Sequence, residues 1–264
     1  MDRVKIDINN QIAVITFNRP EKMNALDPVQ FQAIIEAGEV VGKDASVRAV
    51  VLNGAGRAFC AGIDISGFQT GNDATGGPIV PRTHGITNKW QQAAWVWRAL
   101  PVPVIAAVHG VAFGGGLQIM LGADIKYIKA DTKLSVMEMK WGLIPDMAGT
   151  QLMRHSVRDD IIRELTYTNR IFSGKEAVEY GFATHVSENP MEDAMKLATE
   201  IAGKSPTAIV KAKKLLNAAP YLSLEEGFMM ESVEQDAIIN KKNQLEAIFS
   251  SLQKRPGNFE DYRE

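Results

Sequence analysis

The fold is decided by the stretch Val104-Ile-Ala-Ala-Val108-His109-Gly-Val-Ala-Phe113-Gly114-Gly115-Gly116-Leu117-Gln118-Ile-Met-Leu121. Its first five residues are apolar and partly β-branched, which predicts a short buried strand. A turn follows the strand, and after three glycines the remaining residues predict the start of a helix. The stretch therefore predicts a strand, a tight glycine turn and a helix that begins directly at the turn.

The three glycines Gly114, Gly115 and Gly116 have two interpretations. Without a Cβ they let backbone N–H groups approach a ligand closely, and a helix N-terminus favours a developing negative charge. This predicts a site for an oxyanion. Tight packing of the helix against a neighbour explains the same residues, and the triplet alone leaves both interpretations open.

A second strand-to-turn segment with small residues is Phe59-Cys60-Ala61-Gly62-Ile63-Asp64, which can also present a free backbone N–H. Two such donors that meet at one carbonyl oxygen would stabilise a thioester enolate, as an oxyanion hole does. The sequence does not show whether the two turns meet in space.

Earlier segments alternate between strand and helix. Ile12–Phe17 and Arg48–Asn53 are predicted strands, and between them Asp27 is a predicted N-cap with Pro28 at the first helical position of a helix to about Val41. This alternation is typical of an α/β layer. The fold class is therefore predicted as α/β.

The remaining chain divides into a loop and helices. Residues 66–87 predict a long surface loop, and residues 88–100 predict a helix whose apolar stripe, including Trp90 and Trp97, belongs to the core. Helices are also predicted at 191–203, 206–217 and, with a break, 224–249. We accordingly predict an α/β core over residues 1–190 and a helical C-terminal subdomain over residues 191–264.

Composition favours a soluble globular protein of the cytoplasm. The chain has 264 residues, 45% hydrophobic and 23% charged, and a formal net charge of −2 that gives no general attraction for nucleic acid or an anionic membrane. A single cysteine, Cys60, excludes an intramolecular disulfide and is predicted to be a packed thiol. No apolar run is long enough to span a bilayer, and the four histidines lack metal-ligand spacing, so no metal is expected.

Three polar residues follow the glycine turn: Gln118, then Glu138 twenty residues later, then Asp146 after eight more. The two carboxylates can transfer protons, whereas the amide of Gln118 cannot accept one near neutral pH. The pattern therefore predicts proton transfer and argues against water held between two acids. A structural role remains open at each position: an ion pair for Glu138, a turn for Asp146 and a helix surface for Gln118.

Four segments in this order resemble the motifs of the crotonase family, also called the enoyl-CoA hydratase/isomerase family. They are Asn18-Arg-Pro-Glu-Lys-Met-Asn-Ala-Leu26, Phe59–Asp64, His109–Gly116 and Gly142-Leu-Ile-Pro-Asp-Met-Ala-Gly-Thr150. The resemblance runs from about Val4 to the C-terminal helices. It implies a spiral of ββα units, a helical C-terminal part used in trimerisation, and a homotrimer or a dimer of trimers.

The resemblance also implies an acyl-CoA substrate, with coenzyme A as part of the thioester and no other cofactor. The backbone N–H groups of Ile63 and Gly115 would form the oxyanion hole. Lys22, Met23, Ala25, Ala61 and Asp64 belong to the segments that would lie along the CoA moiety. The loop after Ser66 and the helix with Trp90, Trp95 and Trp97 would shape the acyl pocket.

At the catalytic positions the chain departs from the family's hydratases, which carry a glutamate where Gln118 stands and a second at Glu138. Glu138 alone matches the double-bond isomerases, and Asp146 coincides with the second carboxylate of the dienoyl-CoA isomerases. It also coincides with the nucleophile of aryl-CoA dehalogenases, but those carry tryptophan at position 138. We therefore predict an enoyl- or dienoyl-CoA isomerase, with a 2-enoyl-CoA hydratase or a catalytically silent acyl-CoA- or RNA-binding relative as alternatives.

Overall fold

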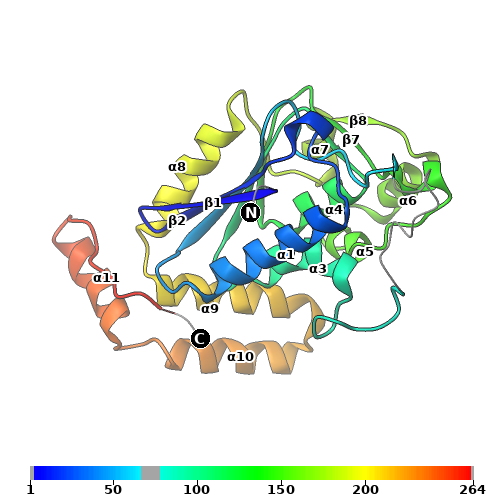
Figure 1. Ribbon diagram of the computed structural model, residues 1–264. Helices are drawn as coiled ribbons and strands as arrows, with labels where there is room; N and C mark the ends of the chain where they lie inside the picture. Colours follow the sequence, from blue (N-terminus) through cyan, green and yellow to red (C-terminus); the bar gives the residue numbers. More distant parts are fainter. Residues whose placement is uncertain (1–2, 67–77, 263–264) are drawn as a thin grey trace.

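A twisted six-stranded sheet forms the centre of the computed structural model, which describes residues 3–66 and 78–262 (Figure 1). The strand order is β1-β2-β3-β4-β6-β9. Their bounds are β1 Val4–Asn9, β2 Ile12–Phe17, β3 Ala49–Gly54, β4 Val104–Val108, β6 Ile125–Ile128 and β9 His185–Val186. Within this sheet only β1 and β2 pair antiparallel, and the neighbours from β2 through β3, β4 and β6 to β9 pair parallel.

A smaller sheet in the order β5-β7-β8 lies beyond the carboxyl end of β4. Its strands are β5 Val111–Phe113, β7 Lys133–Ser135 and β8 Phe172–Ser173. Cys60 forms a parallel bridge with Ala112 of β5. The small sheet therefore holds the turn after β3 beside the glycine turn that follows β5.

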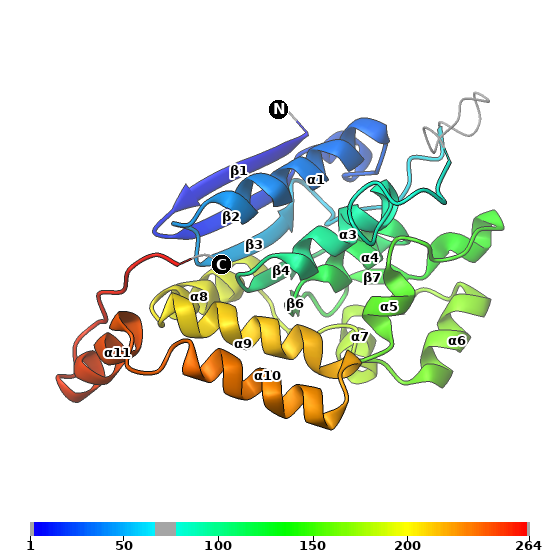
Figure 2. The ribbon, with the colours of Figure 1, turned by 90° about the horizontal axis from the view of Figure 1, so that it is seen from below.

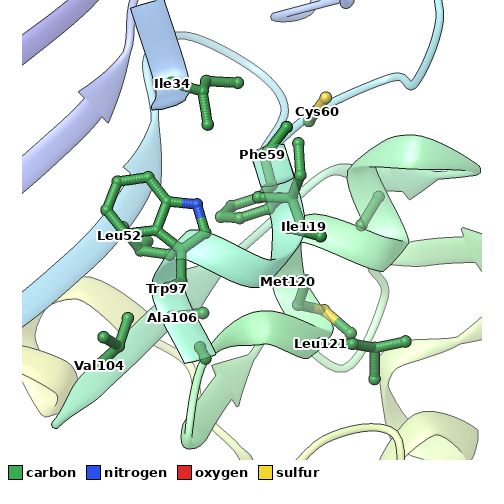
Figure 3. Close-up of a cluster of buried hydrophobic side chains, with 14 of the residues drawn as sticks. Ile34, Leu52, Phe59, Cys60, Trp97, Val104, Ala106, Ile119, Met120 and Leu121 are labelled. Carbon is green, nitrogen blue, oxygen red and sulfur yellow. The ribbon is translucent and has the colours of Figure 1, made fainter. Parts of the chain in front are cut away.

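Helices cover both faces of the large sheet (Figure 2). Helix α8 (Pro190–Ala202) covers one face, where Ala194, Ala198 and Ala202 pack against strand residues such as Val51 and Ile105. Helices α1 (Pro28–Lys43), α3 (Lys89–Ala99) and α4 (Gly115–Gly122) cover the other face. Trp97 of α3 is fully buried there, close to Leu52 and Phe59 (Figure 3).

The other helices lie at the periphery. They are α5 Gly149–Met153, α6 Asp159–Thr168, α7 Gly174–Tyr180, α9 Pro206–Ala218, α10 Leu224–Asp236 and α11 Lys242–Leu252, with single 3₁₀ turns η1 Pro20–Lys22, η2 Met137–Trp141 and η3 Ala219–Tyr221. In both ribbon views α9 and α10 run side by side, and α11 lies at the edge of the molecule away from α6 (Figures 1 and 2).

The predicted α/β class is confirmed, and so are the strands at 12–17 and 104–108. Asp27 caps α1 as predicted, because its side chain accepts a hydrogen bond from Gln30 N at 2.7 Å. The predicted helix at 224–249 is two helices, with its break between Asp236 and Lys242. Part of the predicted loop at 66–87, residues 67–77, lies outside the described residues.

The proposed division of the chain after residue 190 falls within α8, directly after its first residue, Pro190. Helix α8 completes the core of the sheet, and buried Lys213 of α9 reaches back to Asp124 at 2.7 Å. The division into two units therefore stays a prediction. Within residues 3–66 and 78–262, no helix is long and apolar enough to cross a membrane.

Candidate active site

Nine of the predicted site residues line one cavity of about 360 Å³. They come from four segments: the N-terminal turn, the turn after β3, the glycine turn before α4, and η2 with the loop that follows it. The nine residues are Lys22, Met23, Ala25, Ala61, Ile63, Asp64, Gly115, Glu138 and Asp146. Only Gln118 of the predicted set does not line this cavity, because it lies behind the wall.

The backbone of Ile63 is oriented by a short parallel bridge to Leu26. Leu26 N donates to Gly62 O and Asp64 N donates to Leu26 O, each at 2.8 Å. Because neighbouring N–H groups of an extended segment point to opposite sides, the N–H of Ile63 points away from Leu26. Within the described part of the chain this amide has no protein acceptor, so it is free to bind a ligand in the cavity.

The glycine turn supplies the second amide. Gly115 is the first residue of α4, where backbone N–H groups have no partner within the helix. A Cβ on Gly62 would lie 2.5 Å from Phe113 O and 3.6 Å from Gly115 N, so the two turns touch each other. The structure thus brings together the two segments that the sequence could not place.

Close packing explains the other glycines, so both interpretations of the triplet apply. A Cβ on Gly116 would lie 2.3 Å from Cys60 O, so any side chain at this position would clash with that backbone oxygen. Gly114 has φ +49°, and a Cβ there would lie 3.2 Å from Glu138 Oε1. The glycines therefore let α4 begin against the turn after β3 and beside the Glu138 carboxyl group.

Gln118 is buried, and its side chain has three hydrogen-bond partners. Its Oε1 accepts hydrogen bonds from Met147 N and Gly149 N, both at 2.9 Å. Its Nε2 donates to Glu138 Oε1 at 2.6 Å. Because backbone amides can only donate, these contacts fix which end of the amide faces Glu138. A role at the helix surface is therefore wrong for Gln118, which joins the Asp146 loop to Glu138.

Glu138 presents a carboxyl group that is almost buried. Burial raises its pKa, and the nearby charge of Asp146 raises it further, against the opposing effect of hydrogen bonds from its own backbone and Gln118. Its Oε1 is held by Gln118, and its Oε2 is buried without a hydrogen-bond partner in the described part of the chain. Since no ion pair includes Glu138 among the described residues, a structural ion-pair role lacks a partner.

Asp146 lies half-buried in the same cavity, on the loop that Gln118 anchors at Met147. Burial raises its pKa above that of a free carboxyl group. Asp64 differs, because hydrogen bonds from Ser66 and the charge of Arg19 lower its pKa. The cavity therefore contains two carboxyl groups able to take up protons above the usual range and one held as a carboxylate.

The sequence analysis missed Arg19, although it lies within a quoted motif. Its Nη2 lies 2.8 Å from Asp64 Oδ2, and its Nη1 donates to Ala25 O at 3.0 Å. These contacts tie together the two segments whose bridge orients Ile63. No local sequence signal predicts them, since the partners are six and forty-five residues away.

Several other expectations concern nearby residues. Cys60 is fully buried and its pKa is raised to about 12 by burial, so the predicted packed thiol is confirmed. Trp90 and Trp97 belong to the apolar core, and Trp95 lines a second cavity rather than the one described above. Among the residues described, no cluster of three or more His, Cys, Asp or Glu side chains is placed to hold a metal ion.

Fold and cavity together define an α/β protein whose site combines free backbone donors with buried carboxyl groups. Comparison with known protein families gives a match to "Enoyl-CoA hydratase/isomerase" over residues 7–262. The chain therefore belongs to the enoyl-CoA hydratase/isomerase family, and the resemblance to crotonases is confirmed.

Similar proteins carry both activities in their names. Mouse mitochondrial methylglutaconyl-CoA hydratase is 29% identical over 95% of this chain and 80% of its own. Mouse mitochondrial Δ(3,5)-Δ(2,4)-dienoyl-CoA isomerase is 28% identical over 91% of this chain and 76% of its own. The crystal structure of an enoyl-CoA hydratase from Bacillus anthracis superposes with a TM-score of 0.88 at 27% identity, over 97% of this chain and 98% of that one.

Proposed function

We propose that the protein isomerises double bonds of unsaturated fatty acyl-CoA thioesters. The thioester oxygen accepts hydrogen bonds from the N–H groups of Ile63 and Gly115. Glu138 acts as general base and then as general acid, and Asp146 is the second carboxyl group. Substrate supplies coenzyme A, and no further cofactor takes part.

The observation that carries this proposal is the direct contact between Gln118 and Glu138. At 2.6 Å the two side chains leave no space for a water molecule between them. The Gln118 oxygen is already occupied by Met147 N and Gly149 N, and an amide cannot take a proton from water. Activation of water between two acids needs a second carboxyl group where Gln118 stands. Proton transfer within the substrate needs only the carboxyl group of Glu138.

The proposed reaction conserves every atom of the substrate. The Glu138 carboxylate removes a proton from the carbon next to the thioester carbonyl, and the electron pair moves into the enolate. The two backbone N–H groups stabilise the oxygen that becomes negative. Glu138 then returns the proton to the carbon at the other end of the allylic system, and Asp146 serves a more distant carbon when the substrate is a conjugated diene.

Hydration of 2-enoyl-CoA is the second candidate, because the similar proteins named above include hydratases. It needs a water molecule bound by Glu138 in a position that Gln118 does not occupy. A catalytically silent relative that binds acyl-CoA or RNA is the third. A cytoplasmic location, like the absence of nucleic-acid binding, stays a prediction.

Incubation of the protein with 2-enoyl-, 3-enoyl- and 3,5-dienoyl-CoA in heavy water separates these functions by mass spectrometry. We expect deuterium uptake and a shifted double bond without a gain of the mass of water. Addition of water to 2-enoyl-CoA at a higher rate than any isomerisation would select the hydratase. Acyl-CoA binding without turnover of any thioester, or salt-sensitive retention of RNA, would select a silent relative.

A further inference from the structure

A second cavity of about 480 Å³ lies directly behind the loop that carries Asp146. Asp146 and Met147 line the first cavity, and the next residue, Ala148, lines the second. Gln118 holds this short wall from both sides through Met147 N and Gly149 N. The walls of the two cavities therefore share the short segment from Asp146 to Ala148.

The second cavity has an apolar lining that also includes basic side chains. Its apolar lining includes Ile86, Trp95, Ala99 and Tyr221. Arg82 and Arg98 also line it, and none of the described lining residues is acidic. An apolar chain fits such a lining, and an anionic end group fits its charge.

The two arginines differ in how fully they are used. The guanidinium of Arg82 is held by the carbonyl oxygens of Ile79 and Val80 and by Gln91. Arg98 has one long contact, from Nη1 to Asp124 Oδ1 at 3.5 Å. The other Asp124 oxygen accepts a hydrogen bond from Lys213 at 2.7 Å. Arg98 therefore shares a single carboxylate and retains donors for a ligand.

Positive charge exceeds negative charge around Arg98. Asp124 is surrounded by Arg98, Lys126 and Lys213, and burial lowers the pKa of both lysines, with the charge of Arg98 lowering it further. The pKa of Lys126 falls to about 8 despite the attraction of Asp124. One carboxylate does not balance three basic groups, so a ligand carboxylate beside Arg98 would be stabilised by the local field.

We infer that the second cavity receives the far end of the substrate's acyl group and that this end carries a carboxylate bound by Arg98. The preferred substrate is then the CoA thioester of an unsaturated dicarboxylic acid. This inference rests on the proposed function, because it extends the same substrate from the first cavity past Ala148 into the second.

The test compares pairs of enoyl-CoA thioesters of equal length that end in a methyl or a carboxylate group. We expect the carboxylate to raise kcat/KM about 10- to 100-fold at the chain length that reaches Arg98, as expected for a hydrogen bond to a charged group. Arg98→Met should bring this ratio close to one. Arg163→Met is the matched control, since it removes an exposed arginine from the Arg163–Asp159 ion pair on α6.

Binding of the saturated thioesters by calorimetry separates this inference from the proposed function. If no thioester reacts, the proposed function fails, and a carboxylate preference in binding that Arg98→Met abolishes still supports the inference. Equal affinity for both end groups, or a preference that survives Arg98→Met, overturns it. Free adipate that binds without competing with the dicarboxylic thioester would also overturn it, because the cavity would then be a separate site.

Discussion

Glu138 combines a catalytic position with an electrostatic cost to the fold. Because burial raises its pKa, the folded protein binds the proton more tightly than the unfolded chain. Stability from this group is complete below the unfolded pKa of 4.5 and is lost as the pH rises through the higher folded pKa. A neutral side chain of the same shape removes this loss at neutral pH.

Glu138→Gln should therefore separate activity from stability. We expect turnover to fall about 10²- to 10⁴-fold, since general acid–base catalysis is lost. The melting temperature at pH 7 should stay the same or rise, because the bond from Gln118 has an acceptor in either side chain. Steady-state kinetics and calorimetry on the same preparation check both. An active variant, or an inactive one that is less stable, would contradict the role proposed for Glu138.

The pH profile of the reaction depends on the same carboxyl group. The general base must be ionised, so the rate should fall as the pH is lowered through the raised pKa of Glu138, above the ordinary 4.5. Asp146→Asn removes a like charge, and the acidic limb of kcat/KM should then move to lower pH. A limb that does not move in this variant would show that Asp146 has no influence on Glu138.

At the scale of elements, the oxyanion hole depends on contacts made far from the substrate. Arg19 joins Asp64 to the carbonyl of Ala25, on either side of the bridge between Leu26 and Ile63. Its side chain is 11% exposed, so water cannot readily replace these bonds. Arg19 is in this sense a positioning residue, which touches no substrate and orients an amide that does.

Arg19→Met should lower kcat about 10- to 100-fold, the effect expected when a catalytic group moves by about an ångström. Affinity for the thioester should change less than kcat. Arg19→Lys should retain part of the rate that Arg19→Met loses, because lysine keeps the positive charge but not the two donor nitrogens of the guanidinium group. Arg3→Met is the control: it breaks the 2.9 Å pair with Asp27 in the same cluster without touching the Ile63 segment. Equal losses in the Arg19 and Arg3 variants would disprove a specific role of Arg19.

Elements differ in how far the sequence predicted them. Strand β4, helix α1 and the cap at Asp27 were predictable because apolar runs and capping residues act over a few positions. The site residues followed from the order of four motifs. The contacts of Arg19 and the burial of Gln118 were not predictable, because they depend on partners brought together by the sheets. Which of the two cavities Trp95 lines was also not predictable, since a helical stripe does not tell which of two neighbouring cavities it faces.

At the scale of the whole molecule, α10 and α11 carry large apolar side chains that the single chain leaves exposed. They are Leu224, Phe228, Met229, Val233, Leu245, Ile248, Phe249 and Leu252, with exposed fractions between 37% and 80%. Soluble monomers rarely expose so many large apolar side chains on two consecutive helices. A symmetric assembly of identical chains buries such a surface, which agrees with the predicted trimer or dimer of trimers.

Light scattering should therefore give a mass of three or six times 28.9 kDa at micromolar concentration. Phe228→Asp, which puts a charge in the middle of the exposed face of α10, should shift the mass toward that of one chain. Tyr167→Asp is the matched control, because Tyr167 is similarly exposed but lies on α6, away from α11. A monomeric parent protein, or equal dissociation by both variants, would show that the apolar face of α10 and α11 is not the interface.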